Sequence, residues 1–423
     1  MTLDRSKAPD FRIPEDFELF PPTEFLLKNG AKLFFIPTPN LAAVKIEVIG
    51  KGNRASLALE ETLIPSFTLS MLQEGTTSKT SEELANFFDF HASEVSPMLS
   101  YSQEGLSLLT TKKHLAEVIP VFLSLFLDAI FPQEYLEKKQ SQRKLIIQLE
   151  KEKTASKASQ LFRNSLFGSG HPYGLETEEK HVDSVTTAKL KTYYENLLFQ
   201  DIEVFVSGDF EQKELHYLCI KLGVLPNRKR IQEPLLPLVE TIYLVNESRE
   251  NAVQSSIRIG NWSIPKTDPD FFALSVFNTI LGGYFGSRLI KNIREDKGHT
   301  YGISSNLAEI GDSNYWVIGA DVQKAFYQEV IEEIYFEIEK LVSEQIQEDE
   351  IEVVRNYMIG QMLSQFSSSF DLMDRFTSVH HSGLDLSFYT EKLAFLKSFT
   401  AEDVTRIGEK YFKKRAFIEV VVG

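Results

Sequence analysis

Residues 43–50 read AVKIEVIG, and residues 255–262 read SSIRIGNW. Both segments alternate apolar and polar residues, which is the pattern of a half-buried β-strand. Ile46 and Ile257 occupy equivalent places in the two segments, roughly 210 positions apart, so the chain has to be searched for an internal repeat before any motif is interpreted. Such a search shows that the same succession of patterns follows each segment.

The chain contains one unit twice. After each opening strand come an apolar helix, a second strand, three further helices and a closing strand. The corresponding pairs are 61–75 and 270–283, 105–111 and 315–322, 115–130 and 326–341, helices that begin within 132–139 and 347–354, 186–197 and 400–412, and 202–206 and 418–422. Thr186 and Thr400 precede two of these helices, where threonine is a favourable N-cap. This ordered correspondence indicates a duplication.

The duplication predicts the fold class and the domains. Strands and helices that do not strictly alternate favour an α+β fold. We predict two homologous domains, each a mainly antiparallel sheet with helices packed on one face. Residues 223–240 contain Pro226, Pro234 and Pro237, which disfavour helix and favour extended chain. The predicted organisation is therefore a first domain at 1–222, a linker at 223–240 and a second domain at 241–423.

Composition excludes several classes of function. The 423 residues include 60 acidic and 45 basic side chains, a net charge of −15 that disfavours nucleic acid as a partner. The single cysteine, Cys219, can form neither an internal disulfide nor a cysteine-based metal site. The first residues show no secretory signal, and the longest apolar run, 118–127, is shorter than the roughly 20 residues that cross a bilayer. We therefore expect a cytoplasmic protein without membrane or nucleic-acid partners.

The second unit carries a candidate site in GGYFGSRLIKNIREDKGHTY, residues 282–301. Gly282, Gly283 and Gly286 open it, and Arg294 and Tyr301 stand seven positions apart. By their residue types alone, Arg294 suits a solvated helix end and Tyr301 the start of a strand. A structural role therefore remains open beside a functional one.

The pattern LGG-x-x-GSRL-x-x-x-IRE-x-x-G-x-x-Y, together with the duplicated α+β unit, resembles the pitrilysin/insulinase-type (M16) zinc peptidases of the two-domain subfamily. HPYG at 171–174 and VSGD at 206–209 support the resemblance, which extends from about residue 20 to the end. It implies that Tyr301 donates a hydrogen bond to the carbonyl of the scissile peptide, and that Arg294 holds the substrate backbone. The three glycines would let the backbone pass close to another chain.

The zinc site that this resemblance implies has lost its ligands. The family places an H-x-x-E-H helix before a Gly-Thr turn, which here is Gly75-Thr76. The two histidine positions then hold Ser66 and Ser70, the base position holds Leu69, and the downstream ligand falls near Gln148. Serine hydroxyls are poor zinc ligands, and leucine cannot act as a base. We expect neither metal nor cofactor in this chain, and we expect Pro65 to kink or break the helix.

These residues predict the non-zinc subunit of a two-chain peptidase, inactive alone. It would supply Arg294, Tyr301 and half of a peptide-binding chamber to a zinc-bearing M16-type partner, and would form a homodimer when that partner is missing. The alternative is a catalytically inactive peptide-binding or assembly protein. An enzyme acting alone through Ser66 or Ser70 has no histidine and aspartate nearby in sequence to complete a triad.

Overall fold

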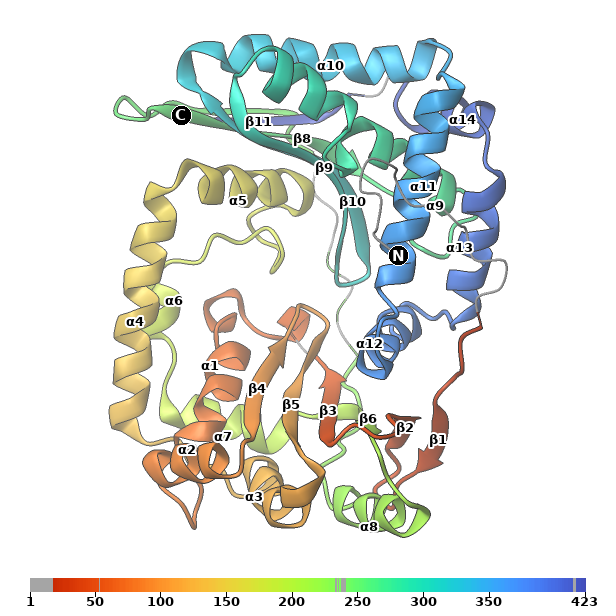
Figure 1. Cartoon of the computed structure of the whole chain (residues 1–423). Coiled ribbons are helices and arrows are strands. Elements are labelled where there is room, and N and C mark those ends of the chain that lie inside the picture. The colour runs from red at the N-terminus through yellow and green to blue at the C-terminus, as the bar shows by residue number, and fades with distance from the viewer. Residues whose placement is uncertain (1–17, 53, 233, 235, 237–240, 414–415) are drawn as a thin grey trace, which may run out of the picture.

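The computed structural model describes residues 18–52, 54–232, 234, 236, 241–413 and 416–423. Figure 1 shows two lobes, each built around one sheet, with helix α4 running along one side between them. In spatial order the first sheet consists of β1 (Thr23–Leu26), β2 (Lys32–Pro37), β6 (Gln200–Gly208), β3 (Ala43–Lys51), β5 (Gln103–Thr111) and β4 (Glu94–Leu99). The second consists of β7 (Leu244–Glu247), β11 (Ile418–Val422), β8 (Gln254–Trp262), β10 (Ser313–Gln323) and β9 (Thr300–Ile310).

The 5-stranded second sheet has the topology of β2, β6, β3, β5 and β4 in the first, and β1 is an additional edge strand of the 6-stranded first sheet. In the first, β2 and β6 are parallel, whereas the remaining neighbours are antiparallel. In the second, β7 and β11 are parallel, and again the remaining neighbours are antiparallel. The strands predicted at 43–50 and 255–262 are β3 and β8, which occupy equivalent places next to the closing strands β6 and β11. The predicted α+β class with mainly antiparallel sheets is confirmed.

The helices repeat in part, because the first half contains more of them than the second. The first half contains α1 (Ile64–Met71), α2 (Ser81–Phe90), α3 (Leu115–Leu127), α4 (Gln133–Glu152), α5 (Thr154–Phe167), α6 (Glu179–Asp183), α7 (Thr187–Asn196) and α8 (Gln212–Leu222). The second contains α9 (Phe271–Asn278), α10 (Tyr327–Ser343), α11 (Glu348–Ser364), α12 (Ser369–His380), α13 (Ser387–Ser398) and α14 (Ala401–Tyr411). Thr186 and Thr400 cap α7 and α14 through their side chains, as predicted.

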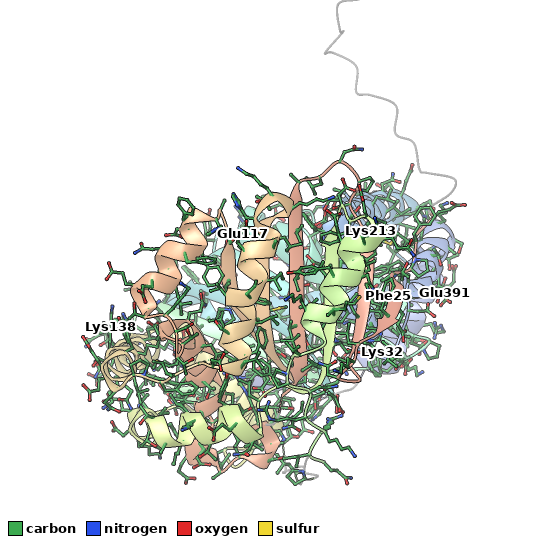
Figure 2. All side chains as sticks on the ribbon, turned by 90° about the horizontal axis from the view of Figure 1, so that it is seen from below. Phe25, Lys32, Glu117, Lys138, Lys213 and Glu391 are labelled. Carbon is green, nitrogen blue, oxygen red and sulfur yellow. The ribbon has the colours of Figure 1, made fainter. Side chains whose placement is uncertain are left out.

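The helices α1, α3 and α7 bury the main core of the first half against one face of its sheet. Phe122 of α3 and Ile46 of β3 are both fully buried in it. Figure 2 looks onto this layer from below and shows Glu117 of α3 and Lys213 of α8 on the outer surface. The apolar run at 118–127 is thus a core helix, and no helix among the described residues is long and apolar enough to cross a membrane.

Each half also lends one helix to the other half's sheet. Met373, Phe376 and Val379 of α12 pack on the first sheet against Phe34 and Phe205. In the equivalent place, α5 packs on the second sheet, where its buried residues Ala158, Phe162, Leu166 and Phe167 meet Ile418, Val420 and Val422. The opposite face of each sheet is therefore covered too, which the prediction of helices on one face did not include.

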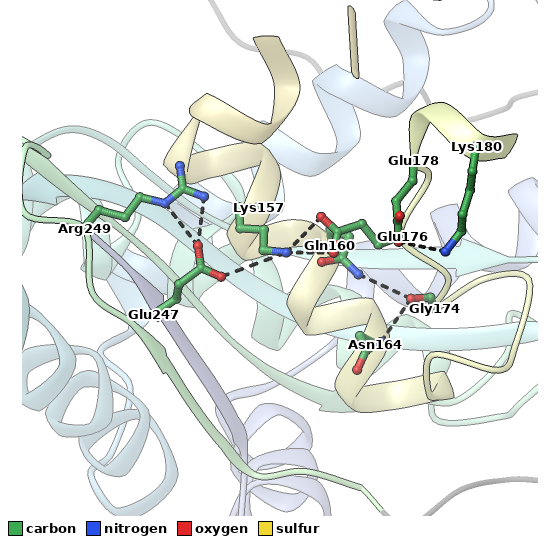
Figure 3. Close-up of polar contacts among 9 residues, drawn as sticks. All are labelled: Lys157, Gln160, Asn164, Gly174, Glu176, Glu178, Lys180, Glu247 and Arg249. Carbon is green, nitrogen blue, oxygen red and sulfur yellow. Dashed lines mark hydrogen bonds and ion pairs between the residues drawn. The ribbon is translucent and has the colours of Figure 1, made fainter. Parts of the chain in front are cut away.

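Ion pairs fix α5 between the halves (Figure 3). The Lys157 ammonium lies 2.8 Å from Glu176 Oε2 and 3.9 Å from Glu247 Oε2, the latter on β7 of the second half. Arg249 holds the same Glu247 at 2.9 Å and donates to the Glu152 carbonyl at the end of α4. These contacts join the end of α4, α5 and the second sheet into one arrangement.

Two expectations need correction. Strand β3 is not half-buried, because α12 covers its second face: Glu47 is buried, and Lys45 binds Asp374 of α12 at 2.6 Å. Pro65 does not break α1, because it lies in the first turn, where a proline removes no helical hydrogen bond. The predicted boundaries at 222 and 241 stay predictions, and residues 233, 235 and 237–240 of the linker, with Pro237, lie outside the described residues.

Candidate functional site

The first candidate region is a cavity of about 890 Å³ bounded by α1, α4 and α5. Ser66 and Ser70 both line it, because they stand four residues apart on one face of α1. Leu69 does not line it, and is buried in the core instead. The structure thus brings together two of the three positions that the zinc helix of the family would use.

Neither serine offers a free ligand atom of the kind that zinc prefers. Ser66 Oγ donates to the Leu63 carbonyl at 2.8 Å, and Ser70 Oγ donates to the Phe67 carbonyl at 3.0 Å. Both hydroxyl hydrogens are therefore used within their own helix, and serine is not a usual zinc ligand. Among the described residues no group of three histidine, cysteine, aspartate or glutamate side chains is arranged to hold a metal ion. The donor set on α1 does not fit zinc.

Gln148, the predicted fourth position, is not brought to the cavity. Its side chain is exposed and donates to Glu179 Oε1 at 2.9 Å. The preceding residue, Ile147, is 2% exposed and lines the cavity together with Ser66 and Ser70. Ile147, one residue before the predicted position, therefore lines the cavity with a hydrocarbon side chain, whereas Gln148 does not line it.

The second candidate region is the surface around Arg294. This residue lies on the π-helical segment Ile290–Asp296, and β9 begins a few residues later at Thr300. The Arg294 guanidinium carbon lies 4.7 Å from the centre of the Phe285 ring and 5.2 Å from the centre of the Tyr301 ring. The predicted pair is therefore in contact, with the guanidinium over both rings.

Arg294, Phe285 and Tyr301, together called the Arg294 group, lie at the surface. Tyr301 is 90% exposed and Phe285 is 64% exposed. Within the described part of the chain, the Arg294 guanidinium has neither an ion pair nor a side-chain hydrogen bond, so all of its donors remain available. Phe285 was not predicted as a site residue, although it lies inside the quoted motif between Gly283 and Gly286. One signal could have indicated it: Phe285 is an aromatic residue in a glycine-rich segment and belongs to no predicted helix or strand.

The glycines lie close to other groups of their own chain, and the predicted close passage of another chain stays a prediction. A Cβ at Gly282 would approach Ser305 Cβ to 2.7 Å, so Gly282 lets the backbone lie against β9 of the same chain. At Gly286 the added atom would meet the Tyr284 ring at 2.8 Å, whereas Gly283 would meet the Asn278 carbonyl at 3.2 Å. The close approach is therefore internal, and no role in passing another chain is needed to explain Gly282.

Two further arginines have structural partners. Arg288 forms a forked pair with Glu350 of α11, at 3.0 and 2.7 Å. Arg258 of β8 donates to Ser159 Oγ and to the Ala155 carbonyl of α5, and burial lowers the pKa of its guanidinium. Arg258 also lines the cavity near Ser66, whereas Arg294, Tyr301 and the three glycines do not. Within one chain, the two candidate regions are not parts of the same pocket.

The duplicated fold carries a guanidinium and a tyrosine in its second half. In its first half, serines stand at the two α1 positions that the resemblance assigns to zinc-binding histidines. Residues 184–358 match the family model described as the Peptidase M16 inactive domain. This match and the relatives that follow bear out the resemblance of the chain to M16-type proteins.

Two relatives from Bacillus subtilis (strain 168) carry different names. An "uncharacterized zinc protease", YmxG, is 23% identical over 83% of this chain and 86% of that protein. A "probable inactive metalloprotease", YmfF, is 23% identical over 56% of this chain and 57% of that protein. The crystal structure of a peptidase M16 inactive domain from Pseudomonas fluorescens shares the fold, with a TM-score of 0.84 at 19% identity over 95% of this chain and 98% of that one.

Proposed function

We propose that this chain is the non-zinc subunit of a two-chain M16-type peptidase. It supplies Arg294 and Tyr301 to peptide bound by a zinc-bearing partner, together with half of the chamber. The observation that carries the proposal is the Arg294 group: a guanidinium stacked on two exposed rings, with none of its donors used within the described part of the chain.

The chemistry of the pair suits peptide held by another subunit. Stacking on Phe285 and Tyr301 fixes the plane of the guanidinium, which leaves its edge donors available for a forked contact with a peptide carbonyl or a carboxylate. The Tyr301 hydroxyl can donate to a carbonyl oxygen as negative charge develops on it, and one such preorganised donor is commonly worth about 10²–10³ in rate. No step through a metal is assigned to this chain, because its own donor set does not fit one.

Two other observations support a division of labour. The α1 positions that the resemblance assigns to zinc-binding histidines carry serines whose hydroxyls donate to carbonyls of their own helix, which supports a chain that leaves metal binding to its partner. Bacillus subtilis has one relative named a zinc protease and one named a probable inactive metalloprotease, the two kinds of chain that such an enzyme needs.

The test is reconstitution. The full chain is mixed with the M16-type chain from the same genome that carries H-x-x-E-H, and cleavage of a quenched fluorescent peptide is followed with and without a chelator. We expect no cleavage by this chain alone, cleavage by the mixture, and a loss of about 10²–10³-fold in the mixture with Tyr301→Phe. Tyr217→Phe removes a hydroxyl from another partly exposed ring, on α8, and serves as the matched control. An unchanged rate with Tyr301→Phe would reject the role given to this residue.

The alternative is a binding protein without catalysis, and it is also supported by Arg294, Phe285 and Tyr301. Exposed aromatic rings beside an arginine are typical of the residues that dominate protein interfaces. The two functions differ in what Tyr301 contributes, because an interface uses the ring and catalysis uses the hydroxyl. If Tyr301→Ala abolishes complex formation while Tyr301→Phe changes neither binding nor any measured rate, the chain is an assembly protein.

A further inference from the structure

The cavity beside Ser66 and Ser70 has an electrostatic character opposite to that of the whole chain. The chain carries a net charge of −15. The cavity lining nevertheless includes seven lysine and arginine side chains and two glutamates. A local positive field inside a negative protein attracts anions to that place and repels them elsewhere on the surface.

Four of these seven cations already have carboxylate partners. Lys139 binds Glu74 at 2.7 Å, and Lys157 binds Glu176 at 2.8 Å. Weaker contacts join Arg143 to Glu150 at 3.7 Å and Arg258 to Asp321 at 3.9 Å. These contacts fix the walls of the cavity, and their charges are at least partly neutralised.

Three cations of the lining have no ion pair within the described part of the chain: Arg54, Lys151 and Arg163. The Nε atoms of Arg54 and Arg163 are buried and have no hydrogen-bond partner there either. A buried N–H without an acceptor is costly, typically by about 1–3 kcal/mol, and it calls for a ligand, an ion or ordered water. The Arg54 guanidinium is held over the Tyr101 ring, 4.8 Å from its centre, so its position is set before any ligand arrives.

Apolar groups lie between the charges. Phe67, Ile147 and Leu175 line the same cavity, and its volume of about 890 Å³ is close to the upper end of ordinary ligand sites. A small inorganic anion would leave most of this space and all of this apolar surface without contacts. A peptide that carries both carboxylates and apolar side chains would use both.

We propose that this cavity binds an acidic peptide segment, with its carboxylates against Arg54, Lys151 and Arg163 and its apolar side chains against Phe67, Ile147 and Leu175. Acidic peptides would then be the substrate class of the two-chain peptidase proposed above. Peptide binding by the cavity does not depend on that function, but the role of the bound peptide as a substrate does. The loss of the zinc ligands and the presence of these cations would then both belong to the conversion of a catalytic site into a peptide-binding site.

The test uses the isolated full chain without partner or zinc. Fluorescence anisotropy compares three labelled peptides of equal length in which leucine alternates with glutamate, glutamine or lysine. We expect the glutamate peptide to bind at least about tenfold more tightly than the glutamine peptide at low salt, and the lysine peptide to bind most weakly. The preference should shrink as the ionic strength rises. Equal affinity for the glutamate and glutamine peptides would overturn the proposal.

Variants locate the site. R54Q/R163Q should reduce the preference for glutamate to less than about twofold, whereas the charge-matched control R230Q/K138Q, at exposed positions outside the cavity, should retain it. K151Q changes an exposed side chain and so keeps the test decisive if the double variant unfolds; it should weaken glutamate binding about threefold. A preference retained in both R54Q/R163Q and K151Q would place the acidic peptide elsewhere and reject the site.

Competition separates a peptide from a small anion. If inorganic phosphate displaces the glutamate peptide while chloride at matched ionic strength does not, the cavity is a small-anion site and the proposal is wrong. The outcome is independent of the reconstitution above. A glutamate preference without cleavage by the mixture rejects the subunit function and retains the acidic-peptide site, whereas cleavage by the mixture without that preference does the reverse.

Discussion

Helix α1 and the Arg294 group are opposite cases of polar side chains in a peptidase-like fold. The hydroxyls of Ser66 and Ser70 face a cavity, yet each is satisfied by a carbonyl of its own helix. The Arg294 guanidinium faces outward over Phe285 and Tyr301, with its donors unused in the described chain. The contacts of the fold use the hydrogens of the serine hydroxyls, whereas they leave the donors of the Arg294 guanidinium to water or to another molecule. Resemblance to a family marked both regions, and hydrogen-bond accounting distinguishes them.

The largest expected effect tests the Arg294 side of this comparison. In the reconstituted complex, Arg294→Ala should lower kcat/KM about 100-fold, because the forked hydrogen bonds of a charged donor are lost. Arg294→Lys should recover only a small part, since an ammonium neither forks nor stacks in the same way. Lys291→Ala, exposed on the same segment, is the control. If Arg294→Ala and Lys291→Ala have equal effects, Arg294 is an ordinary surface charge.

The next effect tests whether the α1 side can be returned to metal binding. S66H/S70H provides two histidines four residues apart on the cavity face, and a third ligand must come from α4. Adding I147E should raise zinc affinity at least about tenfold over the double variant, whereas adding Q148E should not, because position 148 points toward Glu179. Isothermal titration with zinc measures both. Tighter binding with Q148E would show that the register taken from the structure is wrong.

The choice between positions 147 and 148 could not be made from the sequence. The repeat, the succession of strands and helices along the chain and the threonine caps of α7 and α14 could be predicted, because periodicity and capping are local. The step from α1 to α4 crosses the helices α2 and α3, the strands β4 and β5 and the loops that join them. An error of one residue in that step turns a side chain by about 100° around a helix. Gln148 was chosen where Ile147 faces the cavity.

The exchange of helices between the halves could not be predicted for a related reason. The apolar stripes of α5 and α12 show that each buries one face, but not against which sheet. Phe162 and Phe376 could equally have packed on their own halves. Glu47 gave a similar false signal: a charged residue in an alternating strand indicates solvent, and here it is buried because α12 brings Asp374 and Lys45 together over it. Neither fact is contained in a local pattern.

Both candidate regions depend on the relative positions of the two halves of the chain. The contact between α12 of the second half and the first sheet helps to fix these positions, and it can be tested at Glu203. Burial alone would raise the pKa of Glu203 on β6, but hydrogen bonds from His380 and His381, at 2.8 and 3.2 Å, outweigh it and hold the pKa well below its usual range. A lowered folded-state pKa means that the charge stabilises the fold above the unfolded value of about 4.3, and that this stability is lost as the pH falls further.

Glu203→Gln should therefore lower the free energy of unfolding by about 1 kcal/mol near neutral pH, as measured by chemical denaturation. The difference from the wild-type chain should narrow as the pH falls below about 4. Glu391→Gln, at an exposed position of α13 (Figure 2), should show no difference at any of these pH values. A gap for Glu203→Gln that widens in acid would mean that the histidines do not stabilise the carboxylate.

The smallest expected effect belongs to the serines. S66A/S70A should change the free energy of unfolding by less than about 0.5 kcal/mol, because the lost hydrogen bonds run only to the serines' own helix, which alanine also favours. Leu69→Ala, between them in sequence but in the core, should cost about 2–5 kcal/mol, which shows that the assay responds to changes in α1. In the reconstituted complex S66A/S70A should also leave cleavage unchanged. If cleavage fell tenfold or more with stability intact, a serine would be acting in the reaction. The serines of α1 could then no longer be explained by folding alone.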